Sequence, residues 1–385
     1  IKTLYPIAEY NEESGKFDLT VKVKEEKDFK ASFGGVVSSK PFSTGFFELD
    51  YKRLKSTELN FNGNIYFGRF YSSVYSKVRW DIPFDIPFFL EGSFTINQFD
   101  YFNNQSTLID DITAPYIINT EQFAESQIGL PVLNKGKLLF GISYNWQEYN
   151  YYQTSLFQRG DTADITKFNG YSTFAKYEVN SLNRKMFANK GGRVGIMFRH
   201  ISGTEKTIPG STSLFNNVIE KDHEWLILKL NIEKYFFQKA KIRLGAMIDL
   251  TYSDQPFFQN YTATLLNAPA FQPLPETKTI FQDEYRAFSY LGGGLKAIYS
   301  YRNYLDFRLE AYVFQPYEEL NSNSIRTTQL GKEVADRDYI GTFTTVYQTR
   351  IGPIAASLNY YDDADQELSF LVHFGYILFN KKARE

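Results

Sequence analysis

Hydrophobic and polar side chains alternate with a period of two along most of the chain. In residues 241–252 the even positions hold Ile, Leu, Ala, Ile, Leu and Tyr, whereas the odd positions hold Lys, Arg, Gly, Met, Asp and Thr. The same alternation runs through 305–313 and 226–233. Because successive side chains of a β-strand point to opposite faces, this pattern predicts strands with one apolar and one polar face. The sequence therefore predicts an all-β fold.

The number and length of these segments indicate which kind of β protein to expect. Soluble strands average about five or six residues, whereas tilted membrane strands need about 9–11. Most of the expected strands have about ten residues or more, which favours a transmembrane antiparallel β-barrel of about 16 strands. We expect these strands at 28–39, 43–54, 57–70, 72–81, 86–99, 116–131, 137–150, 167–180, 192–204, 222–236, 240–253, 284–300, 302–316, 336–349, 353–362 and 366–380.

The connections between the expected strands alternate in length. Those after the even-numbered strands are mostly tight, whereas those after the fifth, seventh, ninth, eleventh and thirteenth strands are long and polar. Short turns on one side and long loops on the other are typical of barrels in the outer membrane of Gram-negative bacteria. An even number of strands then puts both termini in the periplasm. Aromatic clusters at strand ends, such as 149–152, fit the girdles at the two membrane interfaces.

Two alternatives remain open at this stage. A soluble protein of two Tyr-rich sandwiches would show the same alternation, although no linker rich in Pro, Gly or Ser divides the chain. A passive porin fits the strand pattern as well as any other membrane barrel.

Composition removes several classes of function. The 42 Lys and Arg residues are balanced by 44 Asp and Glu, so the basic excess of a nucleic-acid-binding protein is missing. The chain has no Cys, and its three His residues (His200, His223 and His373) are widely spaced, so we expect no metal site and no cofactor. Residues 141–145 begin like a hydrolase nucleophile elbow but lack its last Gly. We therefore expect no catalytic residues in this chain.

The first residues differ from the rest of the chain. Residues 16–24 alternate like a strand and run into the charged stretch 24–27. We expect residues 1–27 to form the end of a small periplasmic module and a hinge, with the earlier part of that module lying upstream. Residues 28–385 would form the barrel.

The step from KFDLTVKVKEEKDF into KASFGGVVSS resembles the end of a polypeptide-transport-associated (POTRA) module entering a BamA-like, sixteen-stranded barrel. That superfamily includes assembly factors, two-partner secretion transporters and patatin-like phospholipases that carry a C-terminal barrel. The stretches FGGVVSSKPFSTGFFELDY, NKGGRVGIMFRHISG and LDFRLEAYVFQPY resemble the Bacteroidota phospholipases of this group.

This resemblance implies an outer-membrane barrel that anchors, or even translocates, a patatin-like lipid hydrolase encoded upstream. The alternatives are a BamA-like polypeptide assembly or secretion pore, and a passive barrel subunit of an outer-membrane complex. The implied partners are outer-membrane lipids, lipopolysaccharide, the barrel-assembly machinery and a second copy or larger complex.

The resemblance also implies a set of site residues. The superfamily places an Arg of its sixth outer loop in the lumen, where the Arg meets an acid on the barrel wall. In this chain that Arg corresponds to Arg286, in the sequence Tyr-Arg-Ala-Phe, and the candidate acids are Glu310 and Asp306. Both acids share a parity with Arg308, which predicts that they face the lumen together. The alternative is that Arg286 is satisfied by whichever lumen groups lie nearest.

Two further sets of residues are expected to matter. Gly34 and Gly35, beside the seam of the first and last strands, and the run Gly292, Gly293 and Gly294 fit strand bends or close backbone approaches. The two glycines of the first strand could instead weaken the seam. The last strand is expected to show the assembly machinery a lipid-facing row, made of Phe374, Tyr376, Leu378 and Phe379.

Overall fold

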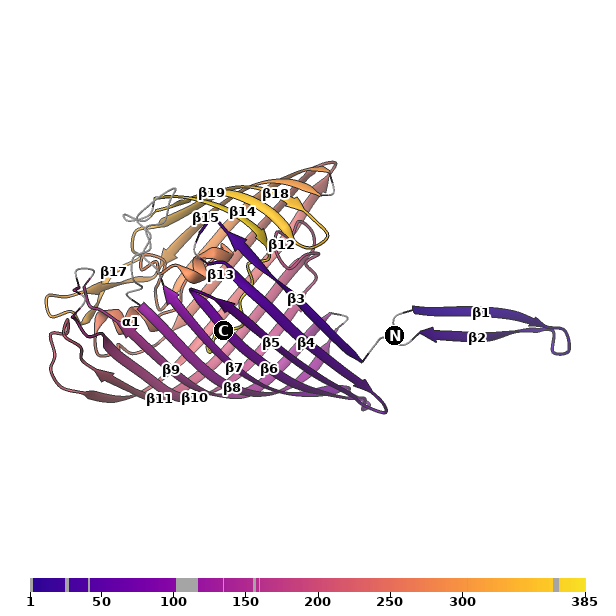
Figure 1. Ribbon diagram of the computed structural model, residues 1–385, viewed down its shortest axis with the longest axis horizontal. Helices are drawn as coiled ribbons and strands as arrows, with labels where there is room; N and C mark the ends of the chain where they lie inside the picture. The colour runs from indigo at the N-terminus through magenta and orange to yellow at the C-terminus, as the bar shows by residue number, and fades with distance from the viewer. Residues whose placement is uncertain are drawn as a thin grey trace.

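The computed structural model describes residues 3–24, 28–40, 42–101, 117–133, 135–154, 157–158, 160–302, 304–362 and 367–385. Sixteen antiparallel strands pair in a closed ring, in which the first strand of the barrel meets the last (Figure 1). The prediction of an all-β barrel of this size is confirmed. The barrel strands are β3 (Phe29–Ser38), β4 (Thr44–Leu54), β5 (Glu58–Gly68), β6 (Tyr71–Ile82), β7 (Phe88–Tyr101), β8 (Ile117–Val132), β9 (Gly136–Tyr151), β10 (Asp164–Asn180), β11 (Gly192–Ile208), β12 (Ile219–Lys239), β13 (Ile242–Ser253), β14 (Tyr290–Arg302), β15 (Leu305–Pro316), β18 (Asp338–Gln348), β19 (Pro353–Tyr361) and β20 (Leu368–Gly375).

Two strand ends differ from the expectation. Strand β14 begins at Tyr290 rather than near residue 284, and β20 ends at Gly375 rather than near residue 380. In both places the residues outside the strand leave the barrel wall. These two departures shape the barrel interior.

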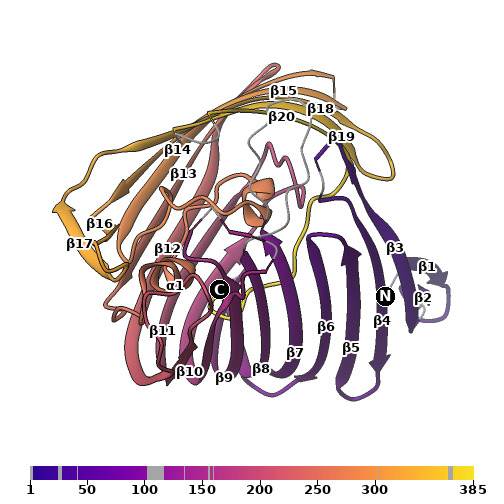
Figure 2. The ribbon, with the colours of Figure 1, turned by 60° about the vertical axis from the view of Figure 1, so that its left-hand side comes forward.

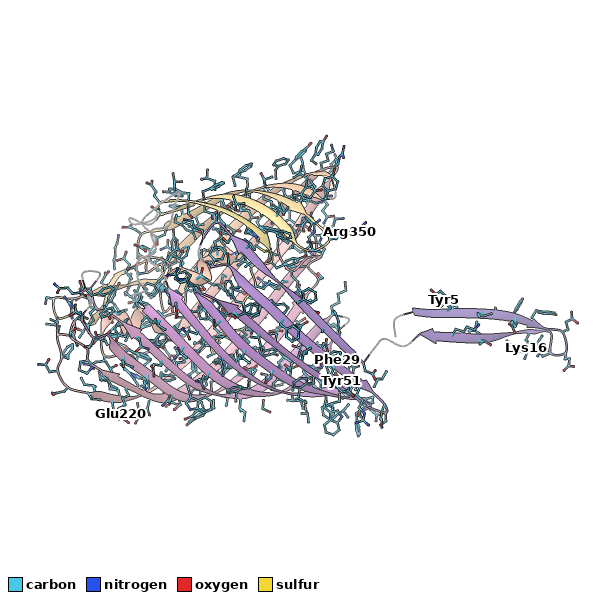
Figure 3. The ribbon with its side chains drawn as sticks, viewed as in Figure 1. Tyr5, Lys16, Phe29, Tyr51, Glu220 and Arg350 are labelled. Atoms are coloured by element: carbon cyan, nitrogen blue, oxygen red, sulfur yellow. The ribbon has the colours of Figure 1, made fainter. Side chains whose placement is uncertain are left out.

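The chain also contains two hairpins outside the wall. Strand β1 (Thr3–Asn11) pairs with β2 (Lys16–Lys24), so the single strand expected at 16–24 has a partner on its N-terminal side. Figures 1 and 3 show this hairpin standing apart from the barrel, with Tyr5 and Lys16 on it. The division into 1–27 and 28–385 stays a prediction. A second hairpin, β16 (Glu318–Ser322) with β17 (Thr328–Glu333), lies in the connection between β15 and β18.

The described helices are short. The α-helix α1 (Tyr261–Asn267) and the 3-10 helix η1 (Pro275–Thr279) both lie in the connection between β13 and β14. None of the helices in the described ranges has the length and apolar character needed to cross a membrane.

The wall of the barrel is much taller on one side than on the other. Strands β8 to β12 have 16 to 21 residues, whereas β3 and β20 have 10 and 8. The tall strands extend at the end that bears the long connections, where outward-facing residues form polar pairs such as Lys167–Glu148 and His200–Glu224. Glu220 marks this end in Figure 3. Because lipid-facing positions are normally apolar, these ends of the strands fit a position beyond the hydrocarbon layer.

Among the described residues, three segments fill the barrel interior. They are the long connection 254–289, the turn 181–191 and the last ten residues, 376–385. Figure 2 shows α1 and the C-terminus inside the ring of strands. Buried aromatic residues of the wall pack against these segments, so apolar burial holds the interior together as it would a soluble core.

Candidate functional site: the seam and the occupied lumen

The seam between β20 and β3 is the shortest ladder in the barrel wall. Only His373, Phe374 and Gly375 pair with β3, opposite Ser38, Val37 and Val36. Each neighbouring ladder is longer, from Phe29 to Val36 between β3 and β4 and from Ile354 to Tyr360 between β19 and β20. Two hydrogen bonds prolong the seam, from Ser39 N to Val372 O at 2.8 Å and from Val372 N to Ser39 Oγ at 3.0 Å.

Below the seam, β3 presents an edge. Within the described chain, residues 29–35 pair with β4 and with no strand on their other side. Phe33 on this edge is 87% exposed. Figure 3 shows Phe29 and Tyr51 together at the lower end of β3 and β4. A row of unpaired backbone groups of this kind is a template for adding another strand.

Two glycines shape the seam. Gly375 has φ 105°, a conformation that L side chains rarely adopt, and a Cβ atom there would lie 2.1 Å from the carbonyl oxygen of Gly35. A Cβ atom on Gly35 would in turn lie 2.3 Å from the carbonyl oxygen of Thr44. Gly34 faces open space, so of the two glycines predicted here only Gly35 is required by a close approach.

After Gly375 the chain leaves the wall and enters the lumen. Phe374 and Tyr376 are each 39% exposed, and their role in the last-strand row stays a prediction. Leu378 and Phe379 instead pack against the interior cluster, where the rings of Phe379 and Tyr71 are 4.8 Å apart. The expectation of a lipid-facing row is therefore wrong for Leu378 and Phe379.

Arg286 is buried in the lumen but does not bind either predicted acid. Its guanidinium donates to the carbonyl oxygens of Leu265, Leu266 and Ala268, at 3.2 to 3.4 Å. These carbonyls form the C-terminal end of α1, where unpaired carbonyl groups and the helix dipole favour a cation. Arg286 thus holds the connection 254–289 together internally, and the predicted pair with Glu310 or Asp306 is corrected.

The two acids do face the lumen, as their parity predicts, but they have other partners. Glu310 accepts from Arg308 Nε at 2.7 Å and from the hydroxyl of Tyr312. Asp306 accepts from Arg184 Nη1 at 2.8 Å and from Ser300 Oγ at 2.6 Å. Because Arg184 belongs to the turn 181–191, these contacts tie that turn across the lumen to β15.

The connection 254–289 reaches the wall through other groups. The hydroxyl of Tyr285 donates to Tyr339 O at 3.0 Å, and Asn260 Nδ2 donates to the hydroxyl of Tyr151 at 2.7 Å. Glu276 accepts from Asn359 Nδ2 at 2.9 Å. Burial, assisted by the nearby charge of Glu310, raises the pKa of the Glu276 carboxyl to about 7. This carboxyl is therefore only partly ionised near neutral pH.

The glycines of β14 make room for aromatic rings. A Cβ atom on Gly292 would lie 2.3 Å from the ring of Phe271, and one on Gly294 would lie 2.1 Å from the ring of Tyr312. Gly293 faces the other way and has space. The predicted close approach therefore exists at Gly292 and Gly294. The nearest neighbour in each case is an aromatic side chain rather than the backbone.

A cavity of about 600 Å³ remains beside these segments. The turn 181–191, η1, the tail residues and the inner faces of β10 to β15 line it, and charged side chains of both signs project into it. Within the described ranges no group of three or more His, Asp or Glu side chains is arranged to hold a metal ion.

Sequence reasoning missed the inward path of the last residues. A signal was present, because Leu378 and Phe379 are adjacent apolar residues that interrupt the period of two. The charged residues that follow would then have to lie in water or against a polar wall.

Comparisons with known proteins identify the fold of this chain. The sequence matches no protein-family profile and no curated protein. The structure is similar to that of BamA from Haemophilus ducreyi lacking POTRA domains 1–3, with a TM-score of 0.60 and 14% identity, over 97% of this chain and 74% of that chain. It is also similar to CdiB from Acinetobacter baumannii, with a TM-score of 0.49 and 9% identity, over 97% of this chain and 64% of that chain. The chain has the fold of a BamA-like, sixteen-stranded outer-membrane β-barrel.

Proposed function

We propose that this chain is an outer-membrane barrel that acts on polypeptides, as an assembly or secretion factor, through the edge of β3 beside the seam. The observation that carries the proposal is the seam itself, where three residue pairs close the barrel and residues 29–35 of β3 lack a second partner strand. A client segment in extended form could add to this edge as a further strand, with the backbone supplying the hydrogen bonds.

The energetics favour opening at this place. A net backbone hydrogen bond contributes about 0.5–1.5 kcal/mol, so a three-residue ladder costs much less to separate than the ladders beside it. A spanning sheet cannot leave its edges unpaired in lipid. The exposed edge therefore gains stability whenever another strand covers it.

The expected phospholipase tether receives no support from the comparisons, and no feature of the described residues favours it. A passive pore is a poorer fit because three inward segments occupy the lumen. We further propose that β1 and β2 end a periplasmic POTRA-like module, that both termini face the periplasm, and that the barrel-assembly machinery is a partner. We also propose that lipopolysaccharide, outer-membrane lipids and a second copy of this chain are partners of the barrel.

A reversible lock on the seam tests the function. Val37 and Phe374 are directly paired and both face outward, and the chain has no other cysteine, so V37C/F374C can form a single disulfide. A photo-crosslinking residue at Phe33 reports contact of the β3 edge with unfolded outer-membrane barrel precursors in cells. We expect adducts with the reduced protein, loss of adducts when the seam is oxidised, and recovery with reductant.

The matched control places the disulfide in a fully paired ladder. Y171C/S202C joins two opposed residues of β10 and β11 and should leave the adducts unchanged. Equal adduct yields with the seam locked and unlocked would contradict the proposal.

A further inference from the structure

The tail, residues 376–385, fits the inner wall of β5 to β12 as a bound peptide fits a receptor. From this fit we infer that this wall is a binding site for extended, cation-rich polypeptide segments. The tail occupies the site in cis as a displaceable self-ligand. The inference rests on the proposed function, because the segments that would replace the tail are those of client polypeptides.

Two buried acids of β8 contact the tail, Glu125 through an ion pair and Glu121 through a hydrogen bond from the backbone. Lys381 Nζ lies 2.8 and 3.1 Å from the two carboxylate oxygens of Glu125, and Ala383 N donates to Glu121 Oε2 at 3.3 Å. Glu121 and Glu125 are only 2% and 6% exposed. Without the tail, the nearest wall cation that contacts Glu125 is Arg199, at 3.7 Å. Loss of Lys381 removes the two shorter contacts of this buried carboxylate and leaves it with the longer one alone, so the empty site would attract another cation.

Aromatic side chains of the wall provide a second kind of contact. The ammonium of Lys382 lies 4.4 Å from the centre of the Phe99 ring and 3.1 Å from the hydroxyl of Tyr101. The guanidinium of Arg384 lies 4.9 Å from the ring of Phe168 and 5.1 Å from that of Trp225. Cations over aromatic faces are stabilised most where water is excluded. The wall thus recognises three basic side chains of the tail.

The wall also binds the backbone of the tail. Asn97 Nδ2 donates to Lys381 O at 2.9 Å, Arg199 Nη1 donates to Ala383 O at 3.4 Å, and Lys176 Nζ donates to Glu385 O at 2.8 Å. Backbone contacts do not depend on the side chains of the ligand. The wall can therefore accept other extended segments, provided that a basic residue meets Glu125.

Displacement of the tail would change the lumen. Lys381 and Glu385 line the 600 Å³ cavity, and the Glu385 carboxylate meets Lys278 of η1 at 3.2 Å. The tail therefore forms part of the lining of the cavity. Its departure would enlarge the open volume of the lumen, so that occupancy of the site can be read as ion conductance.

The experiment uses the whole chain in planar bilayers. The variant K381E/K382E/R384E reverses the three cations that the wall binds. The control K55E/K239E/K241E makes the same change of charge at exposed turn residues. Heat-modifiable migration on gels shows that each barrel is folded. We expect the tail variant to raise the open fraction by about tenfold or more over the control.

A synthetic peptide then tests whether the site binds a segment in trans. The peptide Phe-Asn-Lys-Lys-Ala-Arg-Glu, with the sequence of residues 379–385, should block the opened variant, whereas Phe-Asn-Glu-Glu-Ala-Glu-Glu should not. Glu125→Lys in a K381E background should close the lumen again by restoring the ion pair. A tail variant as closed as the control, or an opened variant that both peptides block equally, would overturn the inference. Seam crosslinking reports on the β3 edge independently, so the failure of one proposal is distinguishable from the failure of the other.

Discussion

The two long segments that enter the lumen are held in different ways. The connection 254–289 is joined to wall strands at both of its ends and buries Phe258, Phe271 and Tyr285 among aromatic residues of the wall. The tail follows Gly375 of β20, and its basic residues are held by ion pairs, cation–aromatic contacts and polar backbone contacts. Apolar burial does not depend on ionic strength, whereas ionic contacts near water do. The barrel therefore combines a permanent plug with a removable one.

The largest expected effect is on the permanent plug. Phe271 is 2% exposed and packs on Gly292, Phe314 and Tyr290. Phe271→Ala should destabilise the barrel by about 3–5 kcal/mol through lost burial and the cavity left behind, measured by denaturant unfolding in detergent. The control is Phe257→Ala, since Phe257 is 38% exposed. Equal losses from the two variants would show that the plug is not a core.

A smaller effect is expected at Arg286, and it separates the observed role from the predicted one. Arg286→Ala removes the guanidinium that donates to the carbonyl groups at the end of α1, at a cost of about 1–3 kcal/mol. Proteolysis within 254–289 should become faster. Glu310→Gln serves as the comparison and should leave that rate unchanged, because Glu310 is paired with Arg308. Equal increases in the proteolysis rate of both variants would instead support the predicted pair of Arg286 with Glu310.

The exit of the tail from the wall is expected to be sensitive to a single methyl group. Gly375→Ala puts a Cβ atom against Gly35 O and strains a φ of 105°, which should cost about 1–2 kcal/mol. Thermal unfolding should show the loss, and Gly34→Ala, in open space, should be close to neutral. An unchanged melting temperature for Gly375→Ala would mean that the seam adjusts without strain.

The smallest effect is a graded response to salt. Raising ionic strength from about 0.05 M to about 1 M shortens the screening length several-fold. Hydrogen exchange at the backbone amides of 381–384 should become faster, whereas exchange at 263–268 in α1 should stay the same. A parallel change in both segments would remove the distinction between the two plugs.

The sequence was sufficient for the wall but not for what fills it. A strand repeats its pattern every two residues, so Leu305 to Pro316 could be assigned from its own residues, and the inward parity of Asp306, Arg308 and Glu310 followed. Partner choice could not be assigned in this way. Arg308 lies two residues from Glu310 on the same face, and Arg184 reaches Asp306 from a turn 122 positions away in the chain. Arg308 and Arg184 therefore pair with the two acids in place of Arg286.

The path of the tail was beyond local reasoning for a similar reason. Phe379 leaves the lipid side because Tyr71 and Phe99 offer an apolar site inside the barrel. The interrupted period at Leu378 and Phe379 signals that the strand ends, but it does not identify these partners, which lie about 280 to 310 positions earlier in the chain.

The seam has a consequence for the order in which the protein forms. Val372 and Ser39 are 333 positions apart in the sequence, and Asn97 and Lys381 are 284 apart. Contacts between such distant residues form slowly, because the long loop must be closed before any contact compensates for its entropy. Neighbouring strands can pair first, and the resulting open sheet has two bare edges until β20 meets β3. Since bare edges are unfavourable in lipid, the last step of folding needs either rapid closure or a helper protein that covers both edges.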